Sequence, residues 1–410
     1  MCGVTQTFYQ QPCGHLARET HFKCEEHQKC GTCWLNRNPL YERAEWNAPD
    51  GQASVLGECG LTVWVNEPSH QTNPRAIRCP SLPATISYAT NPKLPDPFLS
   101  IIGTRITSAS QWTCRKEEIR QLYQRHSLGT MPPKPSNVTA SLSGASLKIV
   151  VTDGGKSTSF SVTIKTPASG TAPYPAIIAF RGGSIPIPSN VATITYQNFD
   201  IGADNGRGKG KFYDLYGSGH SAGAMITWAG FAPRKRVGAT GCSRNGKGAM
   251  VAGAFEDRII LSLPQEGGQG SAGCWRIADE IQKNGTKYVD TVPALPWDGH
   301  LLHSLYATPN RGLLIIENTA IDYLGPTSNF HCASAGRKVF GALSVMENFG
   351  ISQNSHSDHC GFPKAQQPEL TAFVERFLLG KDTKTDVWKT DGEFVQDLSR
   401  WVDWNAPKLS

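Results

Sequence analysis

The stretch Gly241-Cys-Ser-Arg-Asn-Gly-Lys-Gly248 decides the fold of this 410-residue chain. Residues 236–240 before it are typical of a strand, and residues 249–255 after it are typical of a helix. A serine in a sharp turn from strand to helix stands clear of the sheet, and the helix N-terminus offers N–H groups to a developing oxyanion. The turn therefore predicts Ser243 as a nucleophile. Its usual form is G-x-S-x-G, whereas this chain has Asn245 at the last position and a glycine one place later.

Continuous apolar runs on both sides of this turn predict a parallel sheet. Such runs suit strands that are buried on both faces, and they occupy residues 176–180, 237–240, 259–263 and 312–316. Helical patterns lie between or after them, at residues 245–255, 333–342 and 369–378. The alternation predicts an α/β fold, the three-layer sandwich of an α/β-hydrolase with a mostly parallel central sheet.

The region before these strands has the patterns of a helix and a hairpin. Residues 117–126 are typical of a helix, and two alternating runs follow at residues 140–151 and 157–165. Alternation of apolar and polar residues is typical of half-buried antiparallel strands. We expect one antiparallel hairpin to precede the parallel strands.

The first 78 residues differ from the rest of the chain. They are rich in cysteine and histidine and have poor apolar periodicity, so we predict a small separate segment at 1–78 and a catalytic domain at 79–410. The spacing of tetrahedral zinc ligands occurs at Cys24, His27, Cys30 and Cys33. These residues do not form two separated pairs, so a disulfide knot and a cysteine-rich leader are alternative interpretations. No metal is expected in the catalytic domain.

Composition argues against two classes of partner. The net charge of +6 comes without a basic run or basic residues interleaved with aromatic ones, so we expect no nucleic-acid binding. No apolar stretch reaches about 18 residues, so we expect no membrane span. The modest basic excess is compatible with an anionic polysaccharide as partner.

Signals of cellular compartment conflict. The first residues have neither the charged nor the apolar part of a secretory signal. Twelve cysteines and two glycosylation sequons, at Asn137 and Asn284, are by contrast typical of a secreted glycoprotein.

A nucleophilic serine needs a base and an acid that orients the base. Glu266 follows the predicted strand 259–263, at the C-terminal edge where catalytic groups gather in an open α/β sheet. Asp257 precedes the same strand and would lie at its opposite end, and Asp322 after a later strand is a second reserve. We favour Glu266 as the acid, with a loop carboxylate of no catalytic role as the alternative.

The base is expected in a loop near the end of the chain, where His356 and His359 are both candidates. Cys242 adjoins Ser243, and Cys360 adjoins His359. A disulfide between these cysteines would hold nucleophile and base in one small region. We therefore favour His359 over His356.

Two further segments are candidates for stabilising the oxyanion and the substrate. The glycines after Arg181 fit a loop that donates an oxyanion-hole N–H group. Arg244 offers the backbone N–H that follows the nucleophile, and also a guanidinium. Lys247 lies one helical turn deeper on the side of the serine. The alternative for both cations is a solvated basic start of a helix.

Five segments together carry a family resemblance. They begin at Gly241 (G-C-S-R-N-G-K-G-A), Pro264 (P-Q-E-G-G), Gly273 (G-C-W-R-I-A-D), Ile321 (I-D-Y-L-G-P) and His359 (H-C-G-F-P). With them, the chain from residue 79 to residue 404 resembles the fungal glucuronoyl esterases, which are carbohydrate esterase family fifteen. The N-terminal segment is not part of this resemblance.

The resemblance implies a serine esterase that cleaves esters between 4-O-methyl-glucuronic acid of glucuronoxylan and lignin alcohols. It implies Ser243 as nucleophile, Glu266 as acid and His359 as base. Arg244 would stabilise the oxyanion, and Lys247 and Tyr323 would contact the substrate.

Disulfides, cofactors and assembly also follow from the resemblance. It implies the pairs Cys79–Cys114, Cys242–Cys360 and Cys274–Cys332, together with a secreted monomer that needs no cofactor. The resemblance also implies that the catalytic domain binds no metal.

Departures from the family pattern leave two alternative functions open. Tyr323 stands where the family has tryptophan, and the regions 229–236 and 275–301 are shorter than in the family. We expect the shortening at residues 229–236 to leave apolar surface of the sheet exposed to water. Such exposure costs about 25 cal/mol of free energy per Å². The alternatives are a general carboxylesterase with altered selectivity and an inactive homologue that binds polysaccharide.

Overall fold

The computed structural model describes residues 2–10, 16–24, 55–56, 62–63, 79–86, 90–230, 237–281, 292–394 and 397–409. The chain divides into two compact units, residues 1–53 and 54–410. The first unit contains the antiparallel strands β1 (Cys2–Gln10) and β2 (Leu16–Cys24). His27, Cys30, Cys33 and the side chain of Cys24 lie outside the described residues, so the zinc site stays a prediction, as does the boundary at residue 78.

The second unit is built on a ten-stranded sheet with the order β14-β13-β12-β11-β10-β8-β9-β7-β6-β5. Neighbours from β14 to β9 pair in parallel, and β9, β7, β6 and β5 pair antiparallel. The strands are β5 (Asn137–Ser143), β6 (Ser146–Asp153), β7 (Lys156–Lys165), β8 (Ala176–Phe180), β9 (Ala192–Tyr196), β10 (Val237–Cys242), β11 (Ile259–Gln265), β12 (Gly312–Glu317), β13 (Phe349–Gln353) and β14 (Trp388–Lys389). A separate short pair joins β3 (Val55–Leu56) to β4 (Thr62–Val63).

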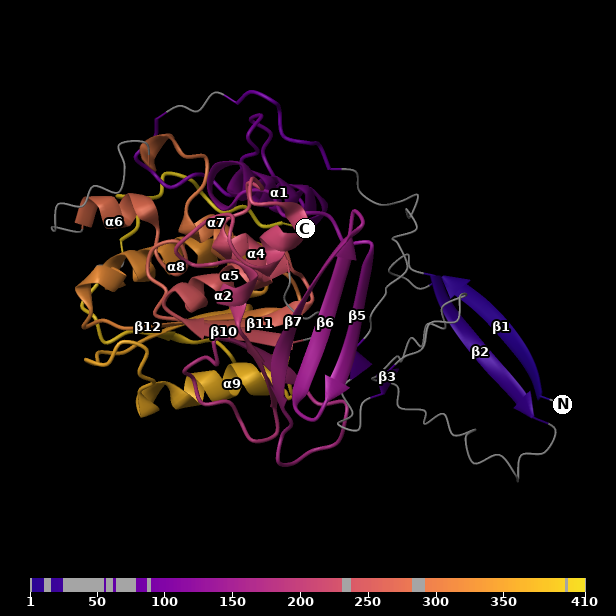
Figure 1. Cartoon of the computed structure of the whole chain (residues 1–410). Helices are drawn as coiled ribbons and strands as arrows, with labels where there is room; N and C mark the ends of the chain where they lie inside the picture. The colour runs from indigo at the N-terminus through magenta and orange to yellow at the C-terminus, as the bar shows by residue number, and fades with distance from the viewer. Residues whose placement is uncertain are drawn as a thin grey trace. The chain divides into compact units, whose positions relative to one another are not determined.

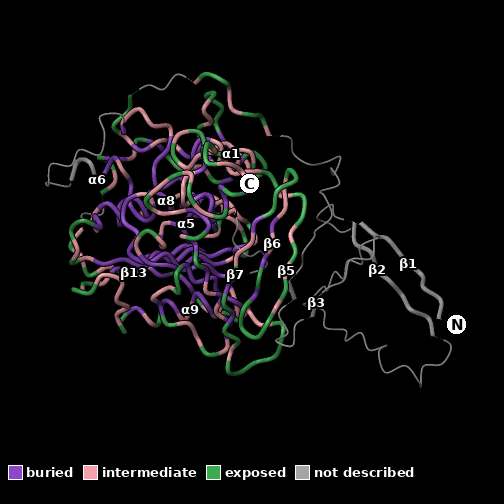
Figure 2. The backbone as a smooth tube through the Cα atoms, viewed as in Figure 1, coloured by how far each residue is buried: buried purple, intermediate pink, exposed green. Residues whose placement is uncertain are grey.

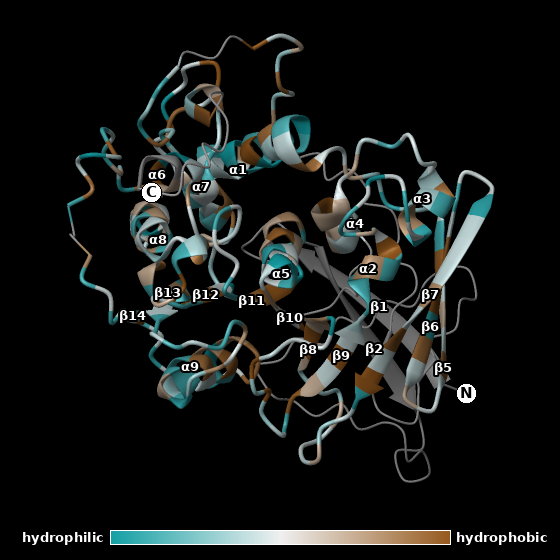
Figure 3. Cartoon of the chain, turned by 60° about the vertical axis from the view of Figure 1, so that its left-hand side comes forward, coloured by the Kyte–Doolittle hydropathy of each residue, from teal (hydrophilic) through white to brown (hydrophobic). Residues whose placement is uncertain are grey.

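Helices cover both faces of this sheet. They are α1 (Ala109–Tyr123), α2 (Asn198–Ile201), α3 (Lys211–Tyr216), α4 (Ala224–Gly230), α5 (Arg244–Phe255), α6 (Trp275–Ile281), α7 (Gly299–Ser304), α8 (Pro326–Ala342) and α9 (Gln367–Phe377). In Figures 1 and 3, α9 lies on one face, and α4, α5, α7 and α8 lie on the other. The predicted three-layer α/β sandwich is confirmed.

Two apolar cores fill the spaces between the layers. Side chains of a strand alternate between faces, and β12 sends Leu313 and Ile315 to one core and Leu314 and Ile316 to the other. The second core contains the apolar face of α9. Figure 2 shows the consequence: the parallel strands and the central helix α5 are mostly buried, whereas β5 and β6 at the antiparallel edge are partly exposed. A rigid, buried sheet gives the loops at its carboxyl edge fixed starting points.

The structure corrects the predicted hairpin. Residues 140–151 are not one strand, because a turn at Gly144-Ala145 separates β5 from β6, and Gly144 has a φ of +55°. Glycine takes this left-handed conformation without the steric cost that a side chain brings. Three antiparallel strands therefore precede the parallel ones, where the alternating pattern indicated two. The short strands β9 and β13 were also not predicted.

The expectation of bare sheet surface beside residues 229–236 is wrong for the strands that the structure describes. Every residue of β8 and β10 is buried. Helix α4 brings Trp228 against α5, where a Cβ added at Gly248 would lie 2.7 Å from the indole ring. Trp228 is itself fully buried. A short helix with one large side chain thus covers α5, although residues 231–236 lie outside the described part.

Among the helices that the structure describes, none has the length and apolar character needed to cross a bilayer.

The free energy of unfolding is expected to fall as the pH drops from about 6.5 to 4, because α7 carries two fully buried histidines. His300 Nε2 lies 2.8 Å from Pro95 O, and His303 Nε2 lies 2.7 Å from Ser271 O. Burial lowers the pKa of His300 to about 3 and the pKa of His303 to about 4. An unfolded chain binds protons at these positions below a pH of about 6.5, so each histidine costs about 1.4 kcal/mol per pH unit in that interval.

Urea unfolding across this pH range measures the effect. His303→Gln should reduce the slope, whereas His126→Gln, at a less buried histidine, should change it less. A free energy of unfolding that stays constant between neutral pH and the acidic limit would contradict the prediction.

Candidate active site

Ser243 occupies the turn between β10 and α5 with a φ of +57° and a ψ of −125°. This conformation is strained for a residue with a side chain, and it is typical of a serine that is held clear of a sheet. Its N–H group donates to Gln265 O at 2.9 Å, and its carbonyl accepts from Lys247 N at 3.0 Å. The turn is therefore fixed on both sides by backbone hydrogen bonds.

The structure explains the displaced glycine of the motif. A Cβ added at Gly246 would lie 2.6 Å from Gln265 O, so the backbone of β11 leaves room only for glycine there. Asn245 is not restricted in this way, and its Oδ1 accepts a hydrogen bond from Asn198 Nδ2 at 3.0 Å. The close approach that requires glycine therefore falls one place later than in the usual motif.

Glu266 and His359 contact each other in the loops next to this turn. Glu266 directly follows β11 and is 1% exposed, and its Oε2 lies 2.7 Å from His359 Nδ1. The same oxygen accepts the backbone N–H of Cys360 at 3.0 Å. With Nδ1–H directed at a buried carboxylate, the imidazole keeps Nε2 for proton transfer. The geometry is that of an acid that orients a base.

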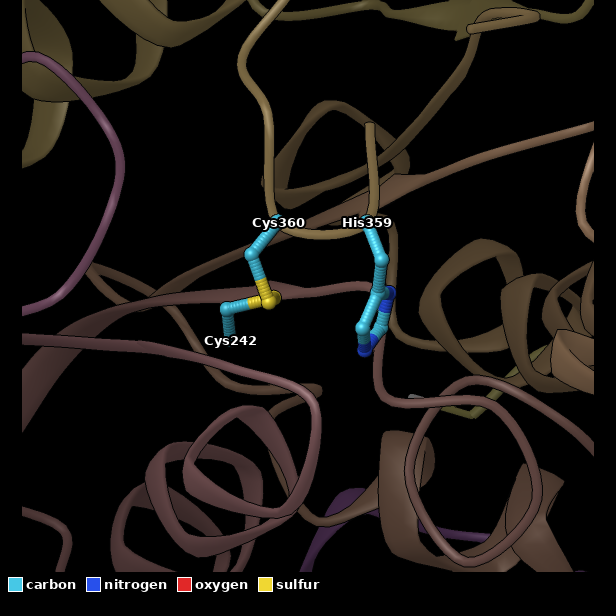
Figure 4. Close-up of side chains that lie close together, drawn as sticks. All are labelled: Cys242, His359 and Cys360. Carbon is cyan, nitrogen blue, oxygen red and sulfur yellow. A yellow bond between two sulfur atoms is a disulfide. The ribbon is translucent and has the colours of Figure 1, made fainter. Parts of the chain in front are cut away.

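The disulfide Cys242–Cys360 ties the serine turn to the histidine loop, with a Cα–Cα distance of 5.7 Å. Figure 4 shows the His359 ring beside this bridge. Cys242, His359 and Cys360 also form a cluster with metal-ligand spacing, but thiolates are the metal-binding form and these sulfurs are bonded to each other. Within the described residues, the structure also has the disulfides Cys79–Cys114 and Cys274–Cys332, as the resemblance implies.

The reserve acids lie elsewhere. Asp257 precedes β11, and its carboxylate lies 3.0 Å from Arg311 Nη1 and 2.5 Å from Arg120 Nη2. Burial raises the pKa of Asp257, but these cations and Lys116 outweigh burial and lower it below its usual value. Asp322 is exposed at the start of the short 3₁₀ turn Asp322–Leu324. Among the residues that the structure describes, neither carboxylate forms a hydrogen bond or ion pair with His356 or His359.

His356, the rival of His359, lies at the same carboxylate. Its Nε2 lies 3.2 Å from Glu266 Oε1, the oxygen that does not contact His359. The sequence presented the two histidines as alternatives, and the structure brings both to Glu266. Their exposures differ, because 16% of the His356 side chain is exposed and 31% of the His359 side chain. His359 is thus the more accessible of the two.

The predicted cations lie at the start of α5. Arg244 has a 63% exposed side chain, and its guanidinium pairs with Asp204. Burial lowers the pKa of Lys247, and the nearby Glu317 acts in the opposite direction. A guanidinium at the surface and a partly buried ammonium therefore flank the serine turn from one helix.

The loop after β8 does not offer the expected oxyanion donor at its first positions. The N–H groups of Arg181, Gly182 and Gly183 donate to the carbonyls of Tyr196, Ala179 and Phe180. These hydrogen bonds of 2.9 to 3.1 Å form a tight turn that keeps all three N–H groups within the protein. The backbone N–H group of Arg244, which follows Ser243, is therefore the candidate for the first donor of an oxyanion hole.

Tyr323 stands at the mouth of the site. Its ring contacts the His359 ring edge to face, with centroids 5.7 Å apart and planes at 75°. The side chain is otherwise open, since Tyr323 is 61% exposed. An exposed aromatic ring beside the base is suited to contact a sugar or an aromatic alcohol.

Glu317 is a buried carboxyl group that sequence reasoning missed. It ends β12 as Glu266 ends β11, and its Oε1 accepts the N–H groups of Gly267 and Gly268 at 2.9 and 3.3 Å. Burial raises the pKa of Glu317 to about 8, and the charge of Glu266 adds to this effect. A carboxylate directly after a buried apolar run was the signal that could have identified it. At neutral pH, Glu317 supports the loop of Glu266 as a neutral acid.

Comparisons with known proteins agree with this geometry. The family model described as glucuronyl esterase of fungi matches residues 149–291 and 283–344. The 4-O-methyl-glucuronoyl methylesterase of Hypocrea jecorina is 46% identical over 370 residues, which are 81% of this chain and 79% of that protein. The protein of the same description from Podospora anserina is 44% identical over 376 residues, 81% of this chain and 78% of that one.

Solved structures are similar over the same part of the chain. The glucuronoyl esterase catalytic domain of Hypocrea jecorina has a TM-score of 0.76 and covers 80% of this chain and 100% of its own. A mutant of the glucuronoyl esterase of Sporotrichum thermophile, in complex with methyl 4-O-methyl-β-D-glucopyranuronate, has a TM-score of 0.76 at 40% identity, covering 81% of this chain and 100% of its own. One of these relatives is 46% identical over 81% of this chain, and the family model matches the chain as well. The chain therefore belongs to the fungal glucuronoyl esterase family.

Proposed function

We propose that the chain hydrolyses esters between 4-O-methyl-glucuronic acid of glucuronoxylan and lignin alcohols, with Ser243, His359 and Glu266 as the catalytic triad. The family's activity is carboxylic ester hydrolysis. The observation that carries the assignment of residues is the 2.7 Å contact between Glu266 Oε2 and His359 Nδ1 beside the serine turn.

The reaction follows from the positions of these groups. Ser243 Oγ attacks the C6 carbonyl of the uronate ester, and His359 takes the serine proton while Glu266 stabilises the imidazolium. The tetrahedral oxyanion is stabilised by the backbone N–H of Arg244 and by its guanidinium. His359 then returns the proton to the leaving alcohol. Water hydrolyses the acyl-enzyme by the same steps in reverse, and no cofactor takes part.

Substrate contacts are proposed at the two ends of the site. Lys247 would bind the oxygen-rich uronate from α5, and the exposed ring of Tyr323 would lie against the sugar. The relative from Sporotrichum thermophile was solved with a methyl ester of a 4-O-methyl-glucuronic acid sugar, which supports a uronate in this position.

We also propose an extracellular location and a monomeric state for the catalytic domain at residues 79–410. Three disulfides in the described residues favour an oxidising compartment. The segment at residues 1–78 would be a separate addition.

Esters of the two candidate classes test this proposal. The kcat/KM for benzyl 4-O-methyl-glucuronate is expected to exceed the value for 4-nitrophenyl acetate by about 100-fold or more, because only the uronate can use polar groups of the site. Equal or better acetate hydrolysis would favour a general carboxylesterase. A folded protein that binds glucuronoxylan but cleaves neither ester would favour the inactive homologue.

A further inference from the structure

We propose that His356 is a positioning residue for the catalytic acid: its Nε2–H group holds Glu266 Oε1 so that Oε2 stays directed at His359. This inference rests on the proposed triad and adds a second histidine to it. The mechanism described above uses one oxygen of Glu266 and one histidine only. The other oxygen and the other histidine are left without a role.

Burial makes the second oxygen important. Glu266 Oε1 is buried and accepts no hydrogen bond from the described residues at normal hydrogen-bonding geometry. A buried carboxylate oxygen without a donor is costly, because nothing replaces the water that it has lost. His356 Nε2 lies 3.2 Å from this oxygen. This distance is within hydrogen-bonding range, so the contact lacks only the alignment of the N–H group.

Asn318 decides which nitrogen of His356 carries the proton. The backbone N–H groups of Ala320 and His356 point at Asn318 Oδ1, at 2.8 and 3.4 Å, which fixes the orientation of the amide. Asn318 Nδ2 then donates to His356 O at 2.9 Å and lies 3.2 Å from His356 Nδ1. An amide N–H can only donate, so Nδ1 must accept and the ring proton sits on Nε2. The nitrogen that carries the proton is therefore the one that lies 3.2 Å from Glu266 Oε1.

The result is a chain of contacts from Asn318 through His356 and Glu266 to His359. Asn318 is fully buried at the end of β12, so the chain begins on the rigid sheet. Each histidine contacts a different oxygen of the carboxylate. Rotation of the carboxylate would break both contacts together. His356 thereby fixes the plane of the Glu266 carboxylate, and with it the direction from which Oε2 contacts His359.

Other titratable groups around this carboxylate must be considered in any pH measurement. Glu317 faces Glu266 from the end of β12, and Lys247 faces Glu317 from α5. On the segment after β14, Asp391 accepts the N–H of Ser355, next to His356, at 2.7 Å. None of these three is altered in the variants below.

His356→Leu tests the proposal with a pH profile. We expect kcat to fall roughly tenfold, the lower end of the effect of removing a group that orients a metal-bound histidine, with KM changed less than twofold. Without the N–H of His356, the charge on the buried Glu266 carboxylate is less well stabilised, so the carboxylate takes up a proton more readily as the pH falls. The acidic limb of kcat/KM should therefore move upward by roughly half a pH unit.

Two further variants separate positioning from a merely structural effect. His356→Gln keeps an N–H donor near the position of Nε2 and should restore most of kcat. Asn318→Ala should resemble His356→Leu, and the double variant should be no slower than either single variant, because both changes break one chain of contacts. Asn354→Ala is the matched control, since it lies in the same loop and its Nδ2 donates to Asp391, away from Glu266.

The outcomes are distinguishable from failure of the proposed function. An unchanged kcat and pH limb in His356→Leu, with Ser243→Ala inactive, overturns this inference alone. Equal losses in His356→Leu and His356→Gln with a lowered Tm would mean a structural role and would also overturn it. Activity that survives in Ser243→Ala overturns the triad itself.

Discussion

Ser243→Ala is expected to reduce kcat/KM for benzyl 4-O-methyl-glucuronate by about 10⁵-fold while the protein stays folded. The substitution removes the proposed nucleophilic oxygen, and the N–H groups and cations around it cannot by themselves form an acyl-enzyme. The Cβ atom remains, so the strained φ of +57° is unchanged and Tm should stay close to that of the unaltered protein.

Ser243→Gly separates the chemistry from the strain. Glycine adopts positive φ without steric cost, so this variant should be equally inactive and more stable by about 1 kcal/mol. Ser334→Ala is the control, because its Oγ donates to Phe330 O within α8 and takes no part in the site. Ester hydrolysis by Ser243→Ala at more than a few per cent of normal would remove the serine mechanism, provided that the control behaves normally.

Local sequence patterns were sufficient to predict that Ser243 and Glu266 lie at the same edge of the sheet. A serine between a strand pattern and a helix pattern can only lie at the carboxyl edge of the sheet, and Glu266 follows the next strand to the same edge. The cysteines beside Ser243 and His359 added one long-range constraint. The sequence pattern thus predicts that Ser243, Glu266 and His359 lie close together in the fold.

Contacts between side chains of distant loops could not be predicted in the same way. His356 and His359 are three residues apart, and nothing in their spacing indicates that both reach one carboxylate. The pairing of Arg244 with Asp204 joins residues 40 positions apart through a loop without regular structure. The turn at Gly144 was missed for a local reason, since the apolar alternation continues across it. Apolar periodicity indicates which residues of a strand share a face. It does not indicate where the chain turns back to form the next strand.

Glu266→Gln is expected to lower kcat by about 10³- to 10⁴-fold with little change in KM, which separates the proposed catalytic acid from its buried neighbour Glu317. An amide is neutral, so it cannot stabilise the His359 imidazolium that forms in the transition state. It can also present N–H to His359 Nδ1 and so favour the wrong tautomer. Single-turnover rates on benzyl 4-O-methyl-glucuronate measure the loss directly.

Glu317→Gln is the matched comparison, because it makes the same chemical change at the end of the neighbouring strand. With a pKa raised to about 8 by burial, Glu317 is already mostly neutral at pH 7. Its Oε1 would still accept from Gly267, and the new amide group would replace the oxygen that now accepts from Asn329 Nδ2 at 3.0 Å. We therefore expect kcat to fall less than about tenfold. A larger loss in Glu317→Gln than in Glu266→Gln would assign the acid to β12, and the contact of 2.7 Å between Glu266 and His359 would then be structural.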